Sequence, residues 1–339
     1  MNILITGAAG FIGFHLAREL AAKGHQVTGL DNINSYYDPA LKYGRLKELG
    51  IGKEALAKAD SAGKAGYIRS SKYENLTFIR CDLCDLPALT GIFEERPFDK
   101  VCNLAAQAGV RYSFENPGAY IQSNVVGFMN ILELSRKYGV SHFVYASSSS
   151  VYGNNAGVPF RENDRTDDPQ SIYAATKKEN ELLAYVYGEQ FELPVTGLRF
   201  FTVYGPWGRP DMAPYLFIRS ILEGKTIKVF NNGNLSRDFS YISDIITGVV
   251  KILEAPPVQN IGIYNIGNSN PVDLMDFIGT IEEVTGKEAV KEFLPMQPGD
   301  VFTTYADTSA IERDYGFSPD TPLSYGIREF YKWYLEFSR

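Results

Sequence analysis

Three glycines near the N-terminus constrain the fold of this chain more than any other feature. Gly7, Gly10 and Gly13 form the pattern G-x-x-G-x-x-G. The apolar run at 2–7 predicts a buried parallel strand, and the spacing of apolar residues over 11–24 predicts a helix directly after it. Glycines at such a junction permit a tight turn and let backbone N–H groups approach a pyrophosphate. The pattern therefore predicts a dinucleotide-binding βαβ unit.

Asp31 gives a second, independent indication of a dinucleotide. It closes the next predicted strand, where a carboxylate accepts a hydrogen bond from the ribose 2′-OH and repels a 2′-phosphate, so NAD is favoured over NADP. The alternative is an aspartate that caps a helix or a turn. The other residues predicted to bind the cofactor lie near the ends of the first four main strands and on two helices: Phe11, Ile12, Asn32, Asp82, Leu83, Leu104, Ala105, Ala106, Gln107 and Asn124.

Strands and helices alternate over the first two hundred residues, which predicts an α/β fold with a doubly wound parallel sheet. We expect further strands at 76–83, 100–106, 142–150 and 195–205, and helices near 86–95, 117–138 and 172–190. Residues 34–75 look like a surface insertion with a helix around 40–60, for which the sequence suggests no role. We divide the chain into a cofactor-binding domain, 1–205, and a smaller C-terminal portion, 206–339, from which a strand at 263–267 returns to the sheet.

Composition limits the function classes. A net charge of -7 and a pI near 5.2 argue against a nucleic-acid partner. The three cysteines, Cys81, Cys84 and Cys102, do not make a disulfide framework. The lone C-x-x-C formed by Cys81 and Cys84 supplies only two of the about four ligands that a zinc site needs. No secretion signal and no apolar run of membrane-spanning length is visible. We therefore expect a cytoplasmic enzyme without a metal.

Tyr173 and Lys177 lie four residues apart, so they share one face of a helix. An ammonium group and an oxidised nicotinamide would both favour the phenolate, which would make Tyr173 a base near neutral pH. Lys177 could also bind the nicotinamide ribose. The serine run at 147–150 ends a predicted strand, where a serine could relay a proton or hold the reacting hydroxyl. Taken separately, the pair could be a solvated helix face and the serines a polar turn.

Together, the glycines, the strand-end serine and the Y-x-x-x-K motif resemble the extended short-chain dehydrogenase/reductase family over nearly the whole chain. The resemblance implies a catalytic set of Ser148, Tyr173 and Lys177. Members that dehydrate a sugar carry Asp-Glu after the Ser/Thr, and decarboxylating members typically carry a Glu there. The stretch "SSSSVYG" has neither, which favours plain epimerisation.

The segments "GPWGRPDMAPYLF", "RDFSYISDI" and "PMQPGDV" are similar to those of UDP-glucuronate 4-epimerases. This resemblance implies an isomerase in which Tyr173 takes the C4 hydroxyl proton and NAD, tightly bound, stores the hydrogen until it returns to the opposite face. It also implies that 206–339 binds the nucleotide sugar and that the chain forms a homodimer through the helices at 117–138 and 172–190.

The same resemblance implies where the UDP-sugar lies. Arg209 is expected to bind the uronate carboxylate, although an ion pair with Asp211 is the alternative. Gln297 and Thr202 depart from the pattern of plain UDP-galactose 4-epimerases. The complete set of residues predicted to contact substrate is Arg111, Ser149, Ser150, Thr202, Arg209, Val229, Phe230, Arg237 and Asp300.

Three other functions remain open. The nearest is a UDP-glucose or UDP-N-acetylglucosamine 4-epimerase of the same family. A decarboxylase or dehydratase would release carbon dioxide or water. A non-catalytic NAD sensor would keep the fold, but it would have no need of Ser148, Tyr173 and Lys177 together.

Overall fold

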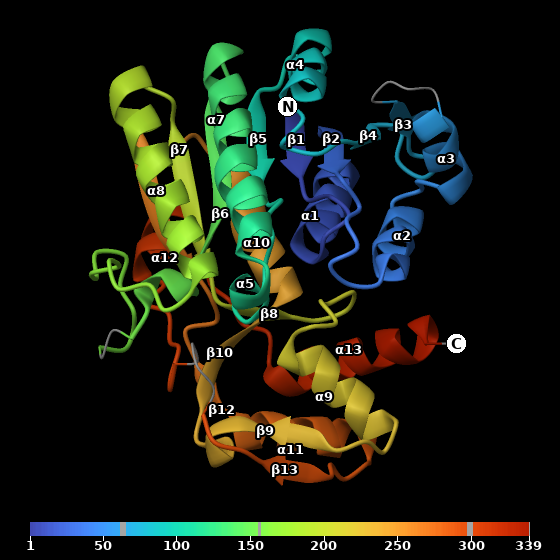
Figure 1. The fold of residues 1–339 in the computed structure, drawn as a ribbon, viewed down its shortest axis with the longest axis vertical. Helices are drawn as coiled ribbons and strands as arrows, with labels where there is room; N and C mark the ends of the chain where they lie inside the picture. Colours follow the sequence, from blue (N-terminus) through green and yellow to red (C-terminus); the bar gives the residue numbers. More distant parts are fainter. Residues whose placement is uncertain (62–65, 155–156, 297–300, 339) are drawn as a thin grey trace.

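An eight-stranded sheet forms the centre of the computed structural model, which describes residues 1–61, 66–154, 157–296 and 301–338 (Figure 1). Its strand order is β11-β7-β6-β5-β1-β2-β4-β3, and every neighbouring pair is parallel except β3 with β4. The strands are β1 (Asn2–Thr6), β2 (Gln26–Asp31), β3 (Tyr67–Arg69), β4 (Leu76–Arg80), β5 (Lys100–Asn103), β6 (His142–Ser148), β7 (Val195–Phe200) and β11 (Ile261–Ile266).

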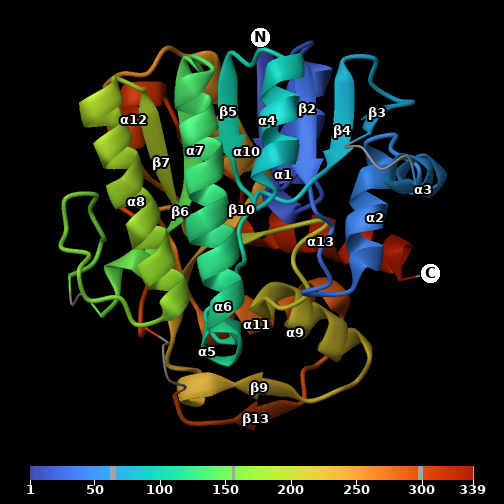
Figure 2. The ribbon, with the colours of Figure 1, turned by 45° about the horizontal axis from the view of Figure 1, so that its top comes forward.

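Helices cover both faces of this sheet, which confirms the doubly wound α/β prediction. Figure 2 shows α4 (Leu86–Glu95), α7 (Gly127–Lys137) and α8 (Ile172–Phe191) on one face. On the other face lie α1 (Phe11–Ala22), α10 (Ile242–Glu254) and α12 (Ser309–Tyr315). Helix α7 buries an apolar stripe; its buried positions include Phe128, Ile131 and Leu132, which have the three- and four-residue spacing of one helix face.

The order of the strands reverses between β1 and β5. From β1 the chain adds β2 and β4 on one side, and it then returns to add β5, β6 and β7 on the other. In open parallel sheets the two crossovers diverge at such a point and leave a crevice at the carboxyl ends of the strands. The glycine turn after β1 and the segment after β5 therefore face each other there.

The structure differs from the sequence-based prediction in three segments. The insertion holds two helices rather than one, α2 (Pro39–Glu48) and α3 (Lys53–Ser61), because the chain turns between them at Gly50, whose φ of 77° breaks the helix. The predicted helix at 117–138 has three parts: α6 (Pro117–Tyr120), a π-helical turn (Ile121–Val126) and α7.

The third difference is the predicted strand at 195–205, which divides. β7 stays in the main sheet, whereas β8 (Thr202–Tyr204) leaves it and pairs with β10 (Ser236–Tyr241). Between the two, the Phe201 amide donates to the carbonyl of Ile266, 3.2 Å away, at the end of β11. The chain thus leaves the main sheet for the C-terminal elements immediately after β7.

The C-terminal elements lie below the carboxyl ends of the main strands in Figure 1. They form a three-stranded sheet, β12-β10-β8, and a two-stranded sheet, β13-β9. The strands of these sheets not yet given are β9 (Ile227–Val229), β12 (Pro271–Asp273) and β13 (Lys291–Phe293). The helices beside them are α9 (Ala213–Leu222), α11 (Leu274–Thr285) and α13 (Leu323–Phe337). In the described ranges, no helix is long and apolar enough to cross a membrane.

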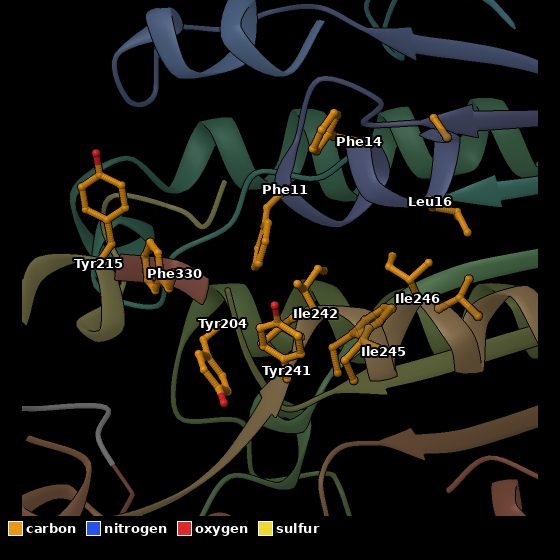
Figure 3. Close-up of a cluster of buried hydrophobic side chains, with 14 of the residues drawn as sticks. Phe11, Phe14, Leu16, Tyr204, Tyr215, Tyr241, Ile242, Ile245, Ile246 and Phe330 are labelled. Atoms are coloured by element: carbon orange, nitrogen blue, oxygen red, sulfur yellow. The ribbon is translucent and has the colours of Figure 1, made fainter. Parts of the chain in front are cut away.

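One hydrophobic cluster joins the two halves. In Figure 3, Phe11 and Phe14 of α1 lie above Ile242 and Ile245 of α10, and the aromatic side chains of the C-terminal elements lie to the left of these isoleucines. The labelled members are Phe11, Phe14, Leu16, Tyr204, Tyr215, Tyr241, Ile242, Ile245, Ile246 and Phe330. The segment after residue 205 supplies both α10 and β11 to the main sheet, as the predicted return strand requires. The position of the C-terminal elements is therefore set by packing against α1 and the main sheet.

Candidate active site

A cavity of about 1120 Å³ runs along the carboxyl ends of the main strands and under the C-terminal elements. Ligand pockets that hold one drug-sized molecule measure about 300–1,000 Å³. This cavity is larger, and its two ends have different linings: the glycine turn and Asp31 at one end, and Phe230 and Arg237 at the other. The shape suits two ligands placed end to end.

The glycine turn is as tight as the sequence predicted. The Gly10 amide donates to the Gly7 carbonyl at 2.8 Å, and Gly7 has a φ of 74°. A Cβ atom built on Gly13 would lie 2.1 Å from the Gly7 carbonyl oxygen, and one on Gly7 would lie 2.9 Å from the Ala105 amide nitrogen. Only hydrogen fits at these positions. The first turn of α1 therefore opens directly onto the cavity, where its N–H groups can meet a pyrophosphate.

Asp31 is held at the end of β2 with its carboxylate beside the turn. It accepts hydrogen bonds from the amides of Ala9 and Ile33, at 3.1 and 2.8 Å. The Lys42 ammonium lies 3.7 Å away, and both side chains are almost fully buried. A carboxylate has about four acceptor sites, so capacity remains for ribose hydroxyls. This donor and acceptor set fits a dinucleotide without a 2′-phosphate.

The other residues predicted to bind the cofactor divide into two groups. Asp82 lies at the cavity wall, where it accepts from Asn32 at 2.8 Å and from the Cys84 amide at 2.9 Å. Burial raises the pKa of Asp82, but these hydrogen bonds outweigh that effect and the pKa is lowered. Phe11, Ile12, Leu83, Leu104, Ala105, Ala106 and Gln107 also line the cavity.

Asn124 does not line the cavity. Its side chain is buried behind the wall, where it accepts from the Gln107 amide at 2.7 Å and donates to the Gln107 carbonyl and to Thr176 Oγ1, each at 3.0 Å. It therefore ties the segment after β5 to α8. We assign it a positioning role in place of direct contact.

Ser148, Tyr173 and Lys177 all line the cavity, and a hydrogen bond links Ser148 to Tyr173. Ser148 ends β6, and its hydroxyl accepts from the Ser150 amide at 3.2 Å. Ser171 caps the N-terminus of α8 by accepting from the Ala174 amide at 3.0 Å, which fixes where the helix starts and thus where Tyr173 points. The Tyr120 ring packs edge-on against Tyr173, with ring centroids 6.2 Å apart.

Burial shifts the pKa of both members of the pair. Burial raises the pKa of Tyr173, and the groups that oppose this rise are the Ser148 hydrogen bond and the Arg209 charge. Lys177 donates to the Ala146 carbonyl at 2.7 Å, and burial lowers its pKa to about 8. The lysine is thus held by the end of β6. Among the groups that lower the pKa of Tyr173, the Ser148 hydrogen bond has the largest effect and the Arg209 charge follows.

The residues predicted to contact substrate mostly line the far end of the cavity. The Arg111 guanidinium lies 4.8 Å from the centre of the Phe230 ring, and Arg237 donates to the Phe302 carbonyl at 3.0 Å. Val229 is fully buried in the core and is absent from the lining, because β9 turns it inward. Asp300 and Gln297 lie outside the described residues. Ser149, Ser150, Thr202, Arg111, Phe230, Arg237 and Arg209 are all at the cavity wall.

Arg209 forms the ion pair that was the alternative to carboxylate binding. Its Nε and Nη2 atoms donate to the two oxygens of Asp211, at 3.1 and 2.5 Å. Both residues nevertheless line the cavity, and the charge of Arg209 reaches Tyr173. The two interpretations therefore do not exclude each other.

Sequence reasoning missed a buried network behind the serines. Ser147 donates to Glu181 at 2.6 Å, and Arg199 donates to both oxygens of Glu181, at 2.8 and 2.9 Å. Breaking a buried pair of this kind typically costs about 3–5 kcal/mol. Because Glu181 is one helical turn beyond Lys177, the network fixes α8 against β6 and β7. Because its residues are far apart in the sequence, no local sequence pattern predicts this network.

The insertion also contributes to the site. Arg45 of α2 is fully buried and donates to the Ala9 carbonyl at 3.0 Å and to the Trp207 carbonyl at 2.7 Å. It thus joins the glycine turn to the loop that carries Arg209. A signal was present in the sequence, since Lys42 and Arg45 share one helix face with the apolar Leu41 and Leu46.

No cluster of three or more metal-binding side chains occurs within the ranges that the structure describes. All three cysteines are free thiols. Burial raises the pKa of Cys81 to about 12, so it has no thiolate character near neutral pH.

Comparison with known proteins adds three findings. Residues 3–267 match the model of the NAD dependent epimerase/dehydratase family. The chain is 46% identical to Protein CapI of Staphylococcus aureus, with 99% of each chain covered. It is 42% identical to UDP-glucuronate 4-epimerase 2 of Arabidopsis thaliana, over 99% of this chain and 76% of the relative.

The solved structures extend the comparison to three dimensions. UDP-glucuronic acid 4-epimerase from Bacillus cereus, crystallised in complex with UDP-glucuronic acid and NAD, superposes with a TM-score of 0.86. It is 34% identical, and the match covers 99% of both chains. The similarity therefore spans both halves of the fold and the cavity between them.

Proposed function

This chain belongs to the NAD dependent epimerase/dehydratase family, and from that premise we propose that it is a UDP-glucuronate 4-epimerase. It interconverts UDP-glucuronate and UDP-galacturonate by oxidising C4 to a ketone and reducing it on the opposite face. The observation that carries the proposal is the convergence of Ser148, Tyr173 and Arg209 on one cavity. That arrangement lets Tyr173 act as a base on a sugar hydroxyl while Arg209 binds a carboxylate of the same sugar.

The residues at the glycine-turn end of the cavity would hold NAD. The amides of the first turn of α1 would donate to its pyrophosphate, and Asp31 would accept from its adenosine ribose. When bound, the cofactor supplies a nicotinamide that takes up the C4 hydrogen with its electron pair and gives it back. Lys177, fixed by its bond to the Ala146 carbonyl, is placed to hold the ribose next to that ring.

Tyr173 takes the proton from the C4 hydroxyl as C4 is oxidised, and it returns the proton after the 4-keto sugar has turned over in the pocket. A buried phenol is a weak base, because burial raises its pKa. The hydrogen bond from Ser148 and the positive charge of Arg209 oppose that rise. Binding of a cationic nicotinamide lowers the pKa further by the same electrostatic rule.

The uronate carboxylate lies toward Arg209, because a planar guanidinium suits a carboxylate better than any other side chain does. Ser149 and Ser150, in the 3₁₀ turn after β6, provide hydroxyl donors on the same wall. Segment 147–152 carries no carboxylate. It therefore offers no additional acid or base for elimination, which supports epimerisation over dehydration.

A second candidate is a 4-epimerase of UDP-glucose or UDP-N-acetylglucosamine. The observation that favours it is the neutralisation of Arg209 by Asp211. A paired guanidinium attracts an anionic sugar less than a free one does. The catalytic step with Tyr173 would be unchanged, and only the choice of sugar would differ.

A homodimer remains a proposal. Large apolar side chains are exposed on α8, where Leu182, Tyr185 and Val186 are about half exposed, and Ile121 and Val126 are exposed on the neighbouring π-helical turn. Helices α7 and α8 pack side by side on this face of the sheet (Figure 2). An apolar patch of this kind supports a protein–protein contact.

A cytoplasmic location is also a proposal, supported by the three free cysteines, which persist as thiols in a reducing compartment.

The reaction itself provides the first test. Purified enzyme incubated with UDP-glucuronate should form UDP-galacturonate, seen by chromatography of the nucleotide sugars. Tyr173→Phe should lower kcat about 10³-fold, because general base catalysis contributes 10²–10⁴-fold. Binding of UDP-glucuronate and NAD should survive in this variant. Undiminished turnover by Tyr173→Phe, or release of carbon dioxide, would contradict the proposal.

The dependence of rate on pH tests the role of Ser148. Because the base must be deprotonated, kcat should rise with pH through the pKa of Tyr173. The Ser148 hydrogen bond lowers this pKa, so Ser148→Ala should move the rising limb to higher pH as well as reduce the maximum rate. Ser220→Ala, a serine of the cavity wall on α9, is the control and should leave the midpoint in place. A midpoint that stays fixed in Ser148→Ala would refute the assignment.

Arg209 separates the two candidate substrates. Arg209→Ala should reduce kcat/KM for UDP-glucuronate about 10- to 100-fold, the effect of losing a charge-assisted hydrogen bond. Any activity on UDP-glucose should be spared. Kinetics with both sugars measure the difference. Equal losses on both would show that Arg209 serves the fold or the diphosphate instead.

The dimer can be tested by sedimentation velocity. Leu182→Glu and Val186→Glu together should convert a dimer to a monomer, because two carboxylates would be buried in the contact. A wild-type protein that sediments as a monomer at micromolar concentration would exclude this proposal.

A further inference from the structure

Three side chains form a closed polar set on the sugar side of the cavity. Arg209 places Nε and Nη2 against the two oxygens of Asp211, and the Tyr36 hydroxyl donates to Asp211 Oδ2 at 3.0 Å. All three residues line the same cavity as Tyr173. Asp211 therefore makes the two-pronged contact with Arg209 that a substrate carboxylate would make.

Tyr36 reaches this position from the insertion. Its hydroxyl lies so close to Gly109 that a Cβ atom there would be 2.3 Å away. Its ring also contacts that of Tyr112, with centroids 4.9 Å apart. The hydroxyl is thus fixed between the segment after β5 and the loop that carries Arg209.

That loop is fastened independently. Arg45 holds the carbonyls of Trp207 and Gly208, and His15 of α1 bonds the carbonyl of Pro206 at 2.9 Å. The backbone before Arg209 is therefore rigidly attached to the cofactor half. Adjustment at this site falls to the side chains of Arg209 and Asp211.

The charges of the pair cancel. Burial raises the pKa of Asp211, but the Arg209 charge and the hydrogen bonds from Arg209 and Tyr36 outweigh it, so Asp211 stays ionised. Its side chain is 27% exposed, compared with 23% for that of Arg209. Asp211 can therefore turn toward water and remain solvated, and its departure would leave the guanidinium facing the cavity.

We propose that Asp211, held by Tyr36, is an internal competitor that occupies Arg209 until the carboxylate of a UDP-uronate displaces it. This inference rests on the proposed function. When a uronate binds, its carboxylate takes the place of the Asp211 carboxylate on the guanidinium of Arg209. A neutral sugar has no group that can replace Asp211 and binds with the pair intact. Asp211 and Tyr36 thus set how strongly the site distinguishes the two classes of UDP-sugar.

The test compares Asp211→Asn with wild type by calorimetric titration of the NAD-loaded enzyme with UDP-glucuronate and UDP-glucose. Loss of the competing charge should lower the Kd for UDP-glucuronate about fivefold, the effect of removing a partly exposed ion pair. The Kd for UDP-glucose should change less than about twofold. Tyr36→Phe should act in the same direction, by a smaller factor, because it only loosens Asp211.

The chain offers a matched control away from the cavity. Asp314 accepts from Arg313 Nε and Nη2, at 2.7 and 3.0 Å, and from the Tyr264 hydroxyl at 2.9 Å. Asp314→Asn makes the same chemical change in the same geometry and should alter neither Kd.

The opposite sign would overturn the inference. If Asp211 only orients Arg209, Asp211→Asn should weaken UDP-glucuronate binding. Unchanged binding, or equal tightening of both sugars, would also contradict a competitor. Failure of the proposed function would look different, because wild-type enzyme would then bind UDP-glucuronate no better than UDP-glucose and would not convert it.

Discussion

The reversal of strand order between β1 and β5 creates the crevice on which the rest of the site depends. Two crossovers leave the sheet in opposite directions there, so the carboxyl ends of the strands stay open. The crevice can admit a dinucleotide only if the turn after β1 stays close to both α1 and the segment after β5. Gly7 and Gly13 allow these close approaches, because a Cβ atom at either position would collide with the backbone of a neighbouring segment.

Burial explains why the catalytic groups need so many partners. A phenol removed from water loses acidity, and an ammonium removed from water loses its proton more easily. Hydrogen bonds oppose these effects of burial. A hydrogen bond from Ser148 favours the phenolate form of Tyr173, and the Ala146 carbonyl in β6 accepts from Lys177. The Glu181–Arg199 pair then fixes the elements that carry them. The polar groups behind the cavity hold the elements in place, whereas those at its wall are the groups that we propose act on the substrate.

The two halves of the chain cooperate through shared elements rather than through a hinge between separate bodies. The segment after residue 205 gives α10 and β11 to the main sheet, and one hydrophobic cluster continues from α1 to α13 (Figure 3). The insertion adds a polar connection, since Arg45 binds both the glycine turn and the Arg209 loop. A change at the glycine turn can therefore affect the position of Arg209.

The sequence by itself determined the features that depend on local pattern. Glycine spacing and strand-end residues were sufficient to predict the doubly wound sheet and NAD as the cofactor, because each reflects the period of one helix or the end of one strand. The catalytic set that the Y-x-x-x-K motif indicates stays a prediction. Only the tertiary structure decided which distant residues meet. The Tyr36–Asp211–Arg209 set, the Glu181–Arg199 pair and the inward position of Val229 all depend on side-chain packing between elements far apart in the chain. Local sequence carries no signal for such contacts, because they exist only after the elements have packed against one another.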